Sequence, residues 1–345
     1  MINMKKDLFE QAEVCRQSTE YSRAVTLYKK ALNEFTKISD IPGVLNCFLS
    51  LGDTLRAKGD FVAAKTYYEE GLNLSESLDD DFAVADSLAG LGLSYRALGD
   101  WSQAMALINR AGRLYVTLRD RKGQAFSAWA RAGTYRIKGD VNKAVKTFQI
   151  ALEKFRALKD SSGMAYSYCG LGGSSRVACK FRDSEKYYKI ANRMFNRLND
   201  RFGLAYSYCG LGNACRMNSD YENALVYFKK AETIYRKIGD RVSYAYTLWS
   251  VGTTYKLIGK IDRAVKSFDE SARFFNETKD PRGQIYCILG IGEIDYLRGK
   301  KKKGMNAFIK SQRLADKYKF GVEKKYAGQL LRAVNNGKGI PSNLP

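Results

Sequence analysis

The chain repeats its own pattern every forty residues over most of its length. An aliphatic residue followed by glycine recurs at this interval, as Leu51-Gly52, Leu91-Gly92, Leu171-Gly172, Leu211-Gly212, Val251-Gly252 and Ile291-Gly292. Aspartate recurs in two other registers, at positions 40, 80, 120, 160, 200, 240 and 280, and at positions 60, 100, 140 and 220. Self-similarity at a fixed period of roughly 20–50 residues indicates a repeat architecture. We therefore expect one continuous solenoid rather than the two or three globular domains that 345 residues would suggest.

One unit, residues 81–120, predicts two helices. Its apolar side chains recur at helical spacing, at Leu88, Leu91, Tyr95, Ala104, Leu107, Ile108 and Ala111. Gly99-Asp100 separates the two helices, and Asp100 is suited to cap the second. A glycine inside a helix costs about 1 kcal/mol relative to alanine, so the recurrence of Gly92 and its equivalents indicates that backbones pack closely there.

The order of residues within a unit resembles the tetratricopeptide repeat (TPR) family. The pattern is Leu-Gly, tyrosine three residues later (Tyr95, Tyr255), Gly-Asp, then alanine, an aromatic residue and alanine (Ala144, Phe148, Ala151). The unit here is forty residues long, whereas the family's usual unit has about 34. The resemblance implies an all-α, right-handed α-solenoid of about eight helix-turn-helix repeats, whose first helices line a concave face, with a C-terminal capping helix.

The expected division of the chain follows the period. The repeats are residues 1–40, 41–80, 81–120, 121–160, 161–200, 201–240, 241–280 and 281–320. The first lacks the Leu-Gly pair, and the fifth has Cys179-Lys180 in place of Gly-Asp. An apolar face after residue 320 predicts a capping helix over 321–334. We expect residues 335–345 to be a disordered tail.

Composition argues against most catalytic chemistry. The chain has no histidine and seven cysteines without a CxxC pair, which removes imidazole acid–base catalysis and the common zinc sites. The glycine-rich segments 170–175 and 210–215 fall in the middle of expected helices, so they are not read as nucleotide-binding loops. We expect no enzyme activity, no metal and no cofactor. An enzyme would need Asp53, Asp86, Glu293 or Asp295, which lie at opposite ends of the array.

The chain is expected to be cytoplasmic. No segment approaches 18 apolar residues, so no membrane span is predicted. The first residues, MINMKKDLFEQAEV, lack the apolar stretch of a secretory signal. The cysteines are interpreted as reduced apolar residues.

Residues in equivalent positions of the first helices form ladders that helix packing does not require. The arginine ladder consists of Arg56, Arg96, Arg136, Arg176, Arg216 and Lys256. The aromatic ladder consists of Phe126, Tyr166, Tyr206, Tyr246 and Tyr286. Beside them are Trp129, Trp249 and Asn213, and the glycines Gly133 and Gly173 are expected to leave a hollow flanked by the two tryptophans. Tyrosine, tryptophan and arginine often anchor interfaces. The alternatives are that the arginines link adjacent repeats and that some tyrosines are buried between repeats.

These ladders and a net charge of +22 predict an interaction scaffold or adaptor. It would hold an acidic or aromatic-bearing segment of a protein partner in a basic, aromatic-lined concave groove. The alternative is binding of single-stranded RNA or DNA, with arginines along the phosphates and tyrosines against the bases. Homo-oligomerisation, by end-to-end stacking or by insertion of a capping helix into another copy, remains open.

Overall fold

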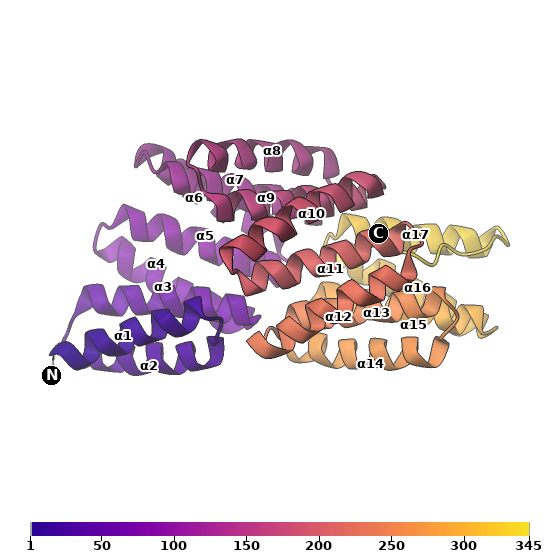
Figure 1. Cartoon of the computed structure of the whole chain (residues 1–345), viewed down its shortest axis with the longest axis horizontal. Helices are drawn as coiled ribbons and strands as arrows, with labels where there is room; N and C mark the ends of the chain where they lie inside the picture. Colours follow the sequence, from indigo (N-terminus) through magenta and orange to yellow (C-terminus); the bar gives the residue numbers. More distant parts are fainter. Residues whose placement is uncertain (1, 345) are drawn as a thin grey trace.

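The computed structural model describes residues 2–344, with side chains from residue 7 onward, and every regular element in that range is an α-helix. Consecutive helices pair as hairpins that stack side by side (Figure 1), as an α-solenoid requires. The helices are α1 (Ile2–Gln17), α2 (Tyr21–Lys37), α3 (Ile41–Lys58), α4 (Phe61–Ser77), α5 (Asp81–Ala97), α6 (Trp101–Thr117), α7 (Arg121–Lys138), α8 (Val141–Ala157), α9 (Ser161–Val177), α10 (Phe181–Leu198), α11 (Arg201–Met217), α12 (Tyr221–Ile238), α13 (Arg241–Leu257), α14 (Ile261–Glu277), α15 (Pro281–Leu297), α16 (Lys301–Lys317) and α17 (Gly321–Asn335).

Aspartate side chains start the first helix of every repeat from the second repeat on. At positions 40, 80, 120, 160, 200, 240 and 280 a carboxylate oxygen accepts a backbone N–H from the first turn, as from Gly203 to Asp200 at 2.8 Å. Each such cap contributes about 1 kcal/mol. Asp60, Asp100 and Asp220 cap second helices in the same way, whereas Asp140 does not. The forty-residue recurrence of aspartate therefore marks helix starts.

The recurrent glycines let aromatic rings insert between helices. A Cβ added at Gly212 in α11 would lie 2.5 Å from the ring of Phe228 in α12, which is fully buried. A Cβ at Gly210 would lie 2.1 Å from the ring of Tyr188 in the preceding repeat. No side chain fits at these distances, so glycine is required here. The close packing predicted from the recurrence of glycine is confirmed.

The superhelix winds tightly enough for successive turns to touch. Gly59, Gly99 and Gly139, in the hairpin turns of repeats two to four, lie against Val242, Pro281 and Gly321, which are 182 or 183 residues further along the chain. One superhelical turn thus takes roughly four and a half repeats. The indole N–H of Trp101 also donates to the carbonyl of Lys319 at 2.9 Å.

The N-terminal hairpin takes part in the same contact between turns. Tyr21 in α2 is buried in a cluster with Ala205, Tyr235, Ile238 and Leu248 of repeats six and seven. Because the second turn closes over the first, the concave face is partly enclosed. Within residues 2–344, no helix is long and apolar enough to cross a membrane.

Candidate functional site

Residues of repeats one to seven, most of them in the first helices, line a cavity of about 960 Å³ on the concave side of the solenoid. Its lining includes Arg56, Arg96 and Arg136 of the arginine ladder, together with Phe126, Trp129, Tyr166 and Tyr206. We call this part of the concave face the open half of the groove. The later members of the arginine ladder, Arg176, Arg216 and Lys256, are not among the residues that line this cavity.

Charges of both signs line the open half, at opposite ends of the helices. Asp120, Asp160, Asp200 and Asp240 are at helix starts, whereas the arginines are in the last turns. Sixteen residues separate Asp120 from Arg136, which corresponds to about 24 Å along α7. The groove therefore has one acidic edge and one basic edge, whereas the ladders alone had suggested a uniformly basic surface.

Arg56 is neutralised within its own repeat. Its guanidinium is 3.3 Å from the carboxylate of Asp53 and donates to the hydroxyl of Tyr68 at 3.3 Å. Burial acts to lower the pKa of Arg56, but Tyr68 and Asp53 together raise it above its ordinary value. This arginine is therefore already paired.

Arg96 and Arg136 form no ion pair with any side chain in the described part of the chain. Among the residues that the structure describes, the ladder forms ion pairs only at its two ends, Arg56 with Asp53 and Lys256 with Glu293. Arg96 donates to the carbonyl of Ala130 in the next repeat at 3.1 Å and lies 5.7 Å from the centre of the Trp129 ring. Burial, followed by the charges of Arg136 and Arg56, lowers the pKa of Arg96 to about 10. The basic edge of the open half thus holds two cations without a counter-charge.

The same arginines take up part of the hollow expected at Gly133 and Gly173. A Cβ at Gly133 would lie 2.4 Å from Nη1 of Arg96, and one at Gly173 would lie 2.1 Å from Nη1 of Arg136. Each arginine therefore extends onto the next repeat, while Gly133 and Trp129 still line the cavity. Arg96 and Arg136 thus contact backbone and glycine in the next repeat. The alternative in which the arginines link adjacent repeats would instead have paired each of them with an acidic side chain.

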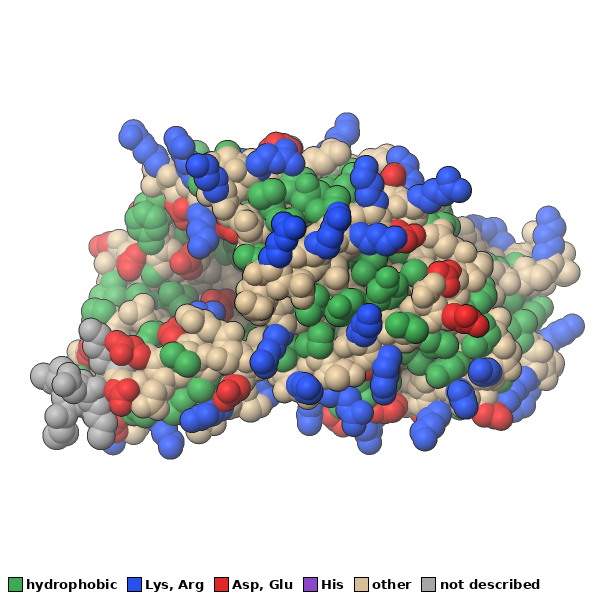
Figure 2. All heavy atoms as spheres, in the orientation of Figure 1, with side chains coloured by type: hydrophobic (Ala, Val, Ile, Leu, Met, Phe, Trp, Pro, Cys, Tyr) green, Lys and Arg blue, Asp and Glu red, His purple; other side chains and the backbone are tan. Residues whose placement is uncertain are grey.

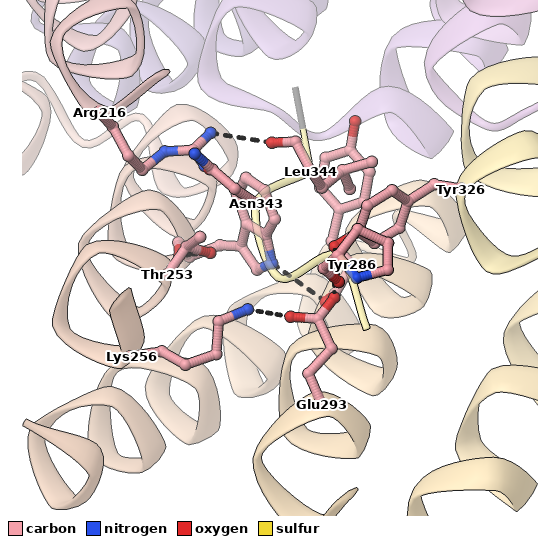
Figure 3. A network of polar contacts seen from close by, with 10 residues as sticks. Arg216, Thr253, Lys256, Tyr286, Glu293, Tyr326, Asn343 and Leu344 are labelled. Carbon is pink, nitrogen blue, oxygen red and sulfur yellow. Dashed lines mark hydrogen bonds and ion pairs between the residues drawn. The ribbon is translucent and has the colours of Figure 1, made fainter. Parts of the chain in front are cut away.

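The second half of the groove surrounds Arg216, with Asn213 and Trp249 beside it. Asn343 and Leu344, near the end of the chain, lie against Arg216 there (Figure 3). Arg216 is fully buried, and its guanidinium lies 5.6 Å from the centre of the Trp249 ring. It donates to Asn213 Oδ1 at 3.1 Å, to the carbonyl of Leu344 at 3.0 Å and to Asn343 Oδ1. Burial, followed by the charge of Arg176, lowers the pKa of Arg216 to about 9.

Residues 336–344, which belong to the segment expected to be a disordered tail, run back along the groove, and residue 345 lies outside the described residues. After α17, residues 338–344 form no helix or strand and return to α11, where the C-terminus lies in Figure 1. Leu344 is only 2% exposed, and the hydroxyl of Tyr326 in α17 donates to the carbonyl of Pro341 at 2.9 Å. We call residues 336–344 the tail.

Lys256 ends the ladder in a buried ion pair. Its ammonium contacts the carboxylate of Glu293 in the next repeat, and that carboxylate also accepts a hydrogen bond from Tyr326 at 2.7 Å (Figure 3). Burial, followed by the charge of Arg216, lowers the pKa of Lys256 below its ordinary value. Lys256 links two repeats and is not accessible to a ligand in this state. Arg176, between the two halves, is half-buried, and its Nε has no hydrogen-bond partner in the described part of the chain.

The aromatic ladder is also divided between the two halves. In the open half Phe126 stacks on Trp129 with 5.8 Å between ring centres, and Tyr206 stacks on Phe202 at 6.2 Å. Tyr166 donates to Asp200 at 2.8 Å. In the second half Tyr246 packs edge-on against Phe275 at 4.7 Å, and Tyr286 is buried against Trp249 at 4.6 Å.

Sequence reasoning missed Tyr326 and the tail. Tyr326 continues the forty-residue register of Tyr206, Tyr246 and Tyr286 into the capping helix, so the repeat itself was a signal for it. Nothing in the composition of the tail indicated that Asn343 and Leu344 reach a residue more than 120 positions earlier.

The described residues offer no cluster of metal-ligating side chains. All seven cysteines are free, and among them only Cys179 is exposed. Burial raises the pKa of the Cys169 thiol well above its usual range, which makes it a poor nucleophile at neutral pH. On the outer surface, lysine and arginine side chains are more numerous than acidic ones on the face shown in Figure 2.

Comparison with known proteins agrees with this architecture. The family model described as "Tetratricopeptide repeat" matches residues 8–77, 47–115 and 203–277, which together span more than half of the chain. No curated protein sequence matches significantly.

Among solved structures, the chain is similar to a Rap protein complexed with competence and sporulation factor (13% identity, 97% of this chain and 98% of that chain, TM-score 0.64). It is similar to the Rap conjugation gene regulator of the plasmid pLS20 in complex with the Phr* peptide (15% identity, 90% and 97%, TM-score 0.65). It is also similar to aspartyl phosphate phosphatase F from Bacillus subtilis (11% identity, 98% and 96%, TM-score 0.50). At such low identity these likenesses show the fold alone. From its family match and its helical repeats, this chain belongs to the tetratricopeptide repeat family.

Proposed function

We propose that this protein is a non-catalytic interaction module that holds an acidic segment of a partner protein in the open half of the groove. The observation that carries the proposal is the pair of arginines, Arg96 and Arg136, which line the cavity without a carboxylate partner. Partly buried cations of this kind favour an anionic group that accepts hydrogen bonds from both guanidinium edges.

The dimensions of the open half suit an extended peptide. Stacked helices are roughly 10 Å apart, so the two guanidinium groups lie about three residues apart along an extended segment. Phe126 and Trp129 add an aromatic surface next to Arg96, where the apolar part of the segment would pack. The Rap protein and the Rap regulator named above were each solved in complex with a peptide or factor, which is consistent with this use of the fold.

Nucleic acid fits the open half less well. Nucleic acid carries a phosphate at every nucleotide, so its backbone would also meet the six aspartates that line the cavity, whereas a peptide can place its few carboxylates at the basic edge alone. The rings of Tyr166 and Tyr206 already pack against Phe195 and Phe202, so they are not free platforms for bases. Acidic peptide is therefore the preferred ligand, and RNA or DNA is the competing outcome of the test.

The test is selection from a random peptide display library, followed by affinity measurement with fluorescent peptides. We expect the selected peptides to be rich in Asp and Glu. The double variant Arg96→Glu/Arg136→Glu should bind these peptides at least tenfold more weakly. The matched control is Arg113→Glu/Arg193→Glu, which makes the same charge change at exposed positions of second helices. Equal affinity for both double variants would overturn the proposal. Salt-sensitive binding of single-stranded oligonucleotides, abolished by the groove variant alone, would replace it with the nucleic-acid function.

A further inference from the structure

We infer that the half of the groove around Arg216 is a second peptide-binding site, which takes a segment carrying a side-chain carboxamide followed by an aliphatic residue. In the present state the chain's own tail occupies this site as a displaceable internal ligand. The inference rests on the proposed function, because it treats the whole groove as a surface for extended segments. We call Asn213, Arg216, Trp249, Tyr286 and Tyr326 the tail pocket.

The tail meets Arg216 as a ligand would. Arg216 is a fully buried cation that donates hydrogen bonds to three neutral oxygens in the described part of the chain, and two of these oxygens belong to Asn343 and Leu344. A buried charge must be hydrogen-bonded, so the pocket is incomplete without an occupant that supplies a carboxamide oxygen and a main-chain carbonyl. Leu344 fills the apolar part of the pocket and is almost completely buried.

The tail has the properties of a segment that can leave. It has no secondary structure, and Gly337, with φ +64°, and Gly339 precede the contacting residues. Neither glycine has anything within 4 Å of an added Cβ, so no side chain packs over the backbone at either position. Between these glycines and Asn343, the hydrogen bond from Tyr326 to Pro341 holds the main chain. Release therefore breaks local contacts without unfolding a repeat.

The tail pocket and the open half are two copies of one arrangement, 120 residues apart. Arg96 lies 5.7 Å from the Trp129 ring centre and Arg216 lies 5.6 Å from the Trp249 ring centre. The two indole N–H groups donate to the carbonyls of the equivalent tyrosines, Tyr166 at 3.3 Å and Tyr286 at 3.0 Å. The copy with Arg96 and Trp129 lines the cavity of the open half, whereas the copy with Arg216 and Trp249 holds the tail.

The difference between the two copies decides what each one selects. In the tail pocket Lys256 is neutralised by Glu293, whereas the equivalent positions in the open half are Arg136 and Gly173. The open half therefore keeps an excess positive charge for an acidic residue, and the tail pocket suits a neutral carboxamide. Three repeats at roughly 10 Å each separate the copies, which is about nine residues of extended chain. A partner segment of that length would have to displace the tail.

The direct test adds the tail back as a peptide. A fluorescein-labelled peptide, NGKGIPSNLP (residues 336–345), is titrated into the full chain and into a chain ending at Gly337. We expect binding to the shortened chain that is at least tenfold tighter than to the full chain, where the attached tail competes at high effective concentration. Alanine in the peptide at the positions of Asn343 and Leu344 should reduce binding at least tenfold. Arg216→Gln in the shortened chain should reduce it by a similar factor.

Folding is controlled by far-UV circular dichroism of each variant. If the shortened chain does not fold, Asn343→Ala/Leu344→Ala in the full chain releases the same contacts and replaces it. In the Trp101→Phe/Trp129→Phe background, Trp249 is the single tryptophan, and its fluorescence reports occupation of the tail pocket. Equal peptide affinity for the closed and released chains, or no binding to a folded released chain, would overturn the inference. Acidic peptides that change Trp129 fluorescence in a Trp101→Phe/Trp249→Phe chain test the open half separately, so the proposed function can stand or fall independently.

Discussion

Gly139 offers the sharpest test of the contact between superhelical turns. It has φ +92° in the turn between α7 and α8, and an added Cβ would lie 3.1 Å from the Cα of Gly321 and 3.5 Å from the backbone nitrogen of Val322. Gly299 has φ +83° in the equivalent turn of the last repeat, but nothing lies within 4 Å of its added Cβ. The two glycines differ only in the presence of a neighbouring turn.

Alanine at each position separates backbone strain from the contact. A left-handed alanine costs roughly 1–2 kcal/mol, and we expect Gly299→Ala to lower the free energy of unfolding by that amount. Gly139→Ala must in addition push apart two backbone segments, and crowding of this kind costs about 1–3 kcal/mol. We therefore expect a total loss of about 2–5 kcal/mol for Gly139→Ala.

Urea denaturation followed by circular dichroism measures the loss of stability, and small-angle X-ray scattering measures the shape. A shift of a few tenths of an ångström relieves the contact at Gly139, so the radius of gyration should stay unchanged for Gly139→Ala and for Gly299→Ala, and stability alone separates the two. Gly321→Ala is the more severe variant, because its Cβ would lie 2.2 Å from the carbonyl oxygen of Lys138, at a helical position where alanine otherwise stabilises by about 1 kcal/mol. The radius of gyration should rise for Gly321→Ala, because the two turns must separate there. Equal losses of stability for Gly139→Ala and Gly299→Ala would refute the reasoning and leave the groove as an open cleft.

Three further outcomes follow from buried groups. Burial raises the pKa of Asp240 to about 6 from an ordinary 3.8; the folded state therefore binds this proton more tightly, and the stability it contributes at low pH is lost as pH rises through 6. The free energy of unfolding of Asp240→Asn, relative to that of the wild type, should therefore rise by about 3 kcal/mol between pH 4 and pH 7. A difference in urea unfolding that does not change with pH would contradict this. Lys256→Ala leaves Glu293 buried and unpaired and should cost about 3–5 kcal/mol, whereas Lys256→Met/Glu293→Leu should cost much less; similar losses in calorimetry would argue against the pair. Gly173→Ala should displace the Arg136 guanidinium, which a Cβ would approach to 2.1 Å, and weaken acidic peptides severalfold with little change in melting temperature; unchanged peptide affinity would remove Arg136 from the site.

Short-range physics made much of this protein predictable from its sequence. The aspartates at 120, 160 and 200 cap helices through contacts two or three residues away, and glycine and aromatic residues pair within a hairpin or between adjacent hairpins. These interactions recur with the period, so the all-helical solenoid and the register of both ladders follow from residues read in order.

The environment of each ladder residue depends on contacts with residues that are distant in the sequence, and the forty-residue pattern does not indicate these contacts. Arg56, Arg96 and Arg216 occupy the same register, yet one is paired with Asp53, one faces the cavity unpaired and one is buried beneath the tail. Two events separate them: the second superhelical turn closes over the first, 182 or 183 residues away, and the end of the chain returns to α11. The sequence by itself determined the solenoid and the register of its side chains, because those depend on neighbours in the chain. Only the tertiary structure decided which half of the groove is open, because the winding of the superhelix and the path of the tail bring together residues that are distant in sequence.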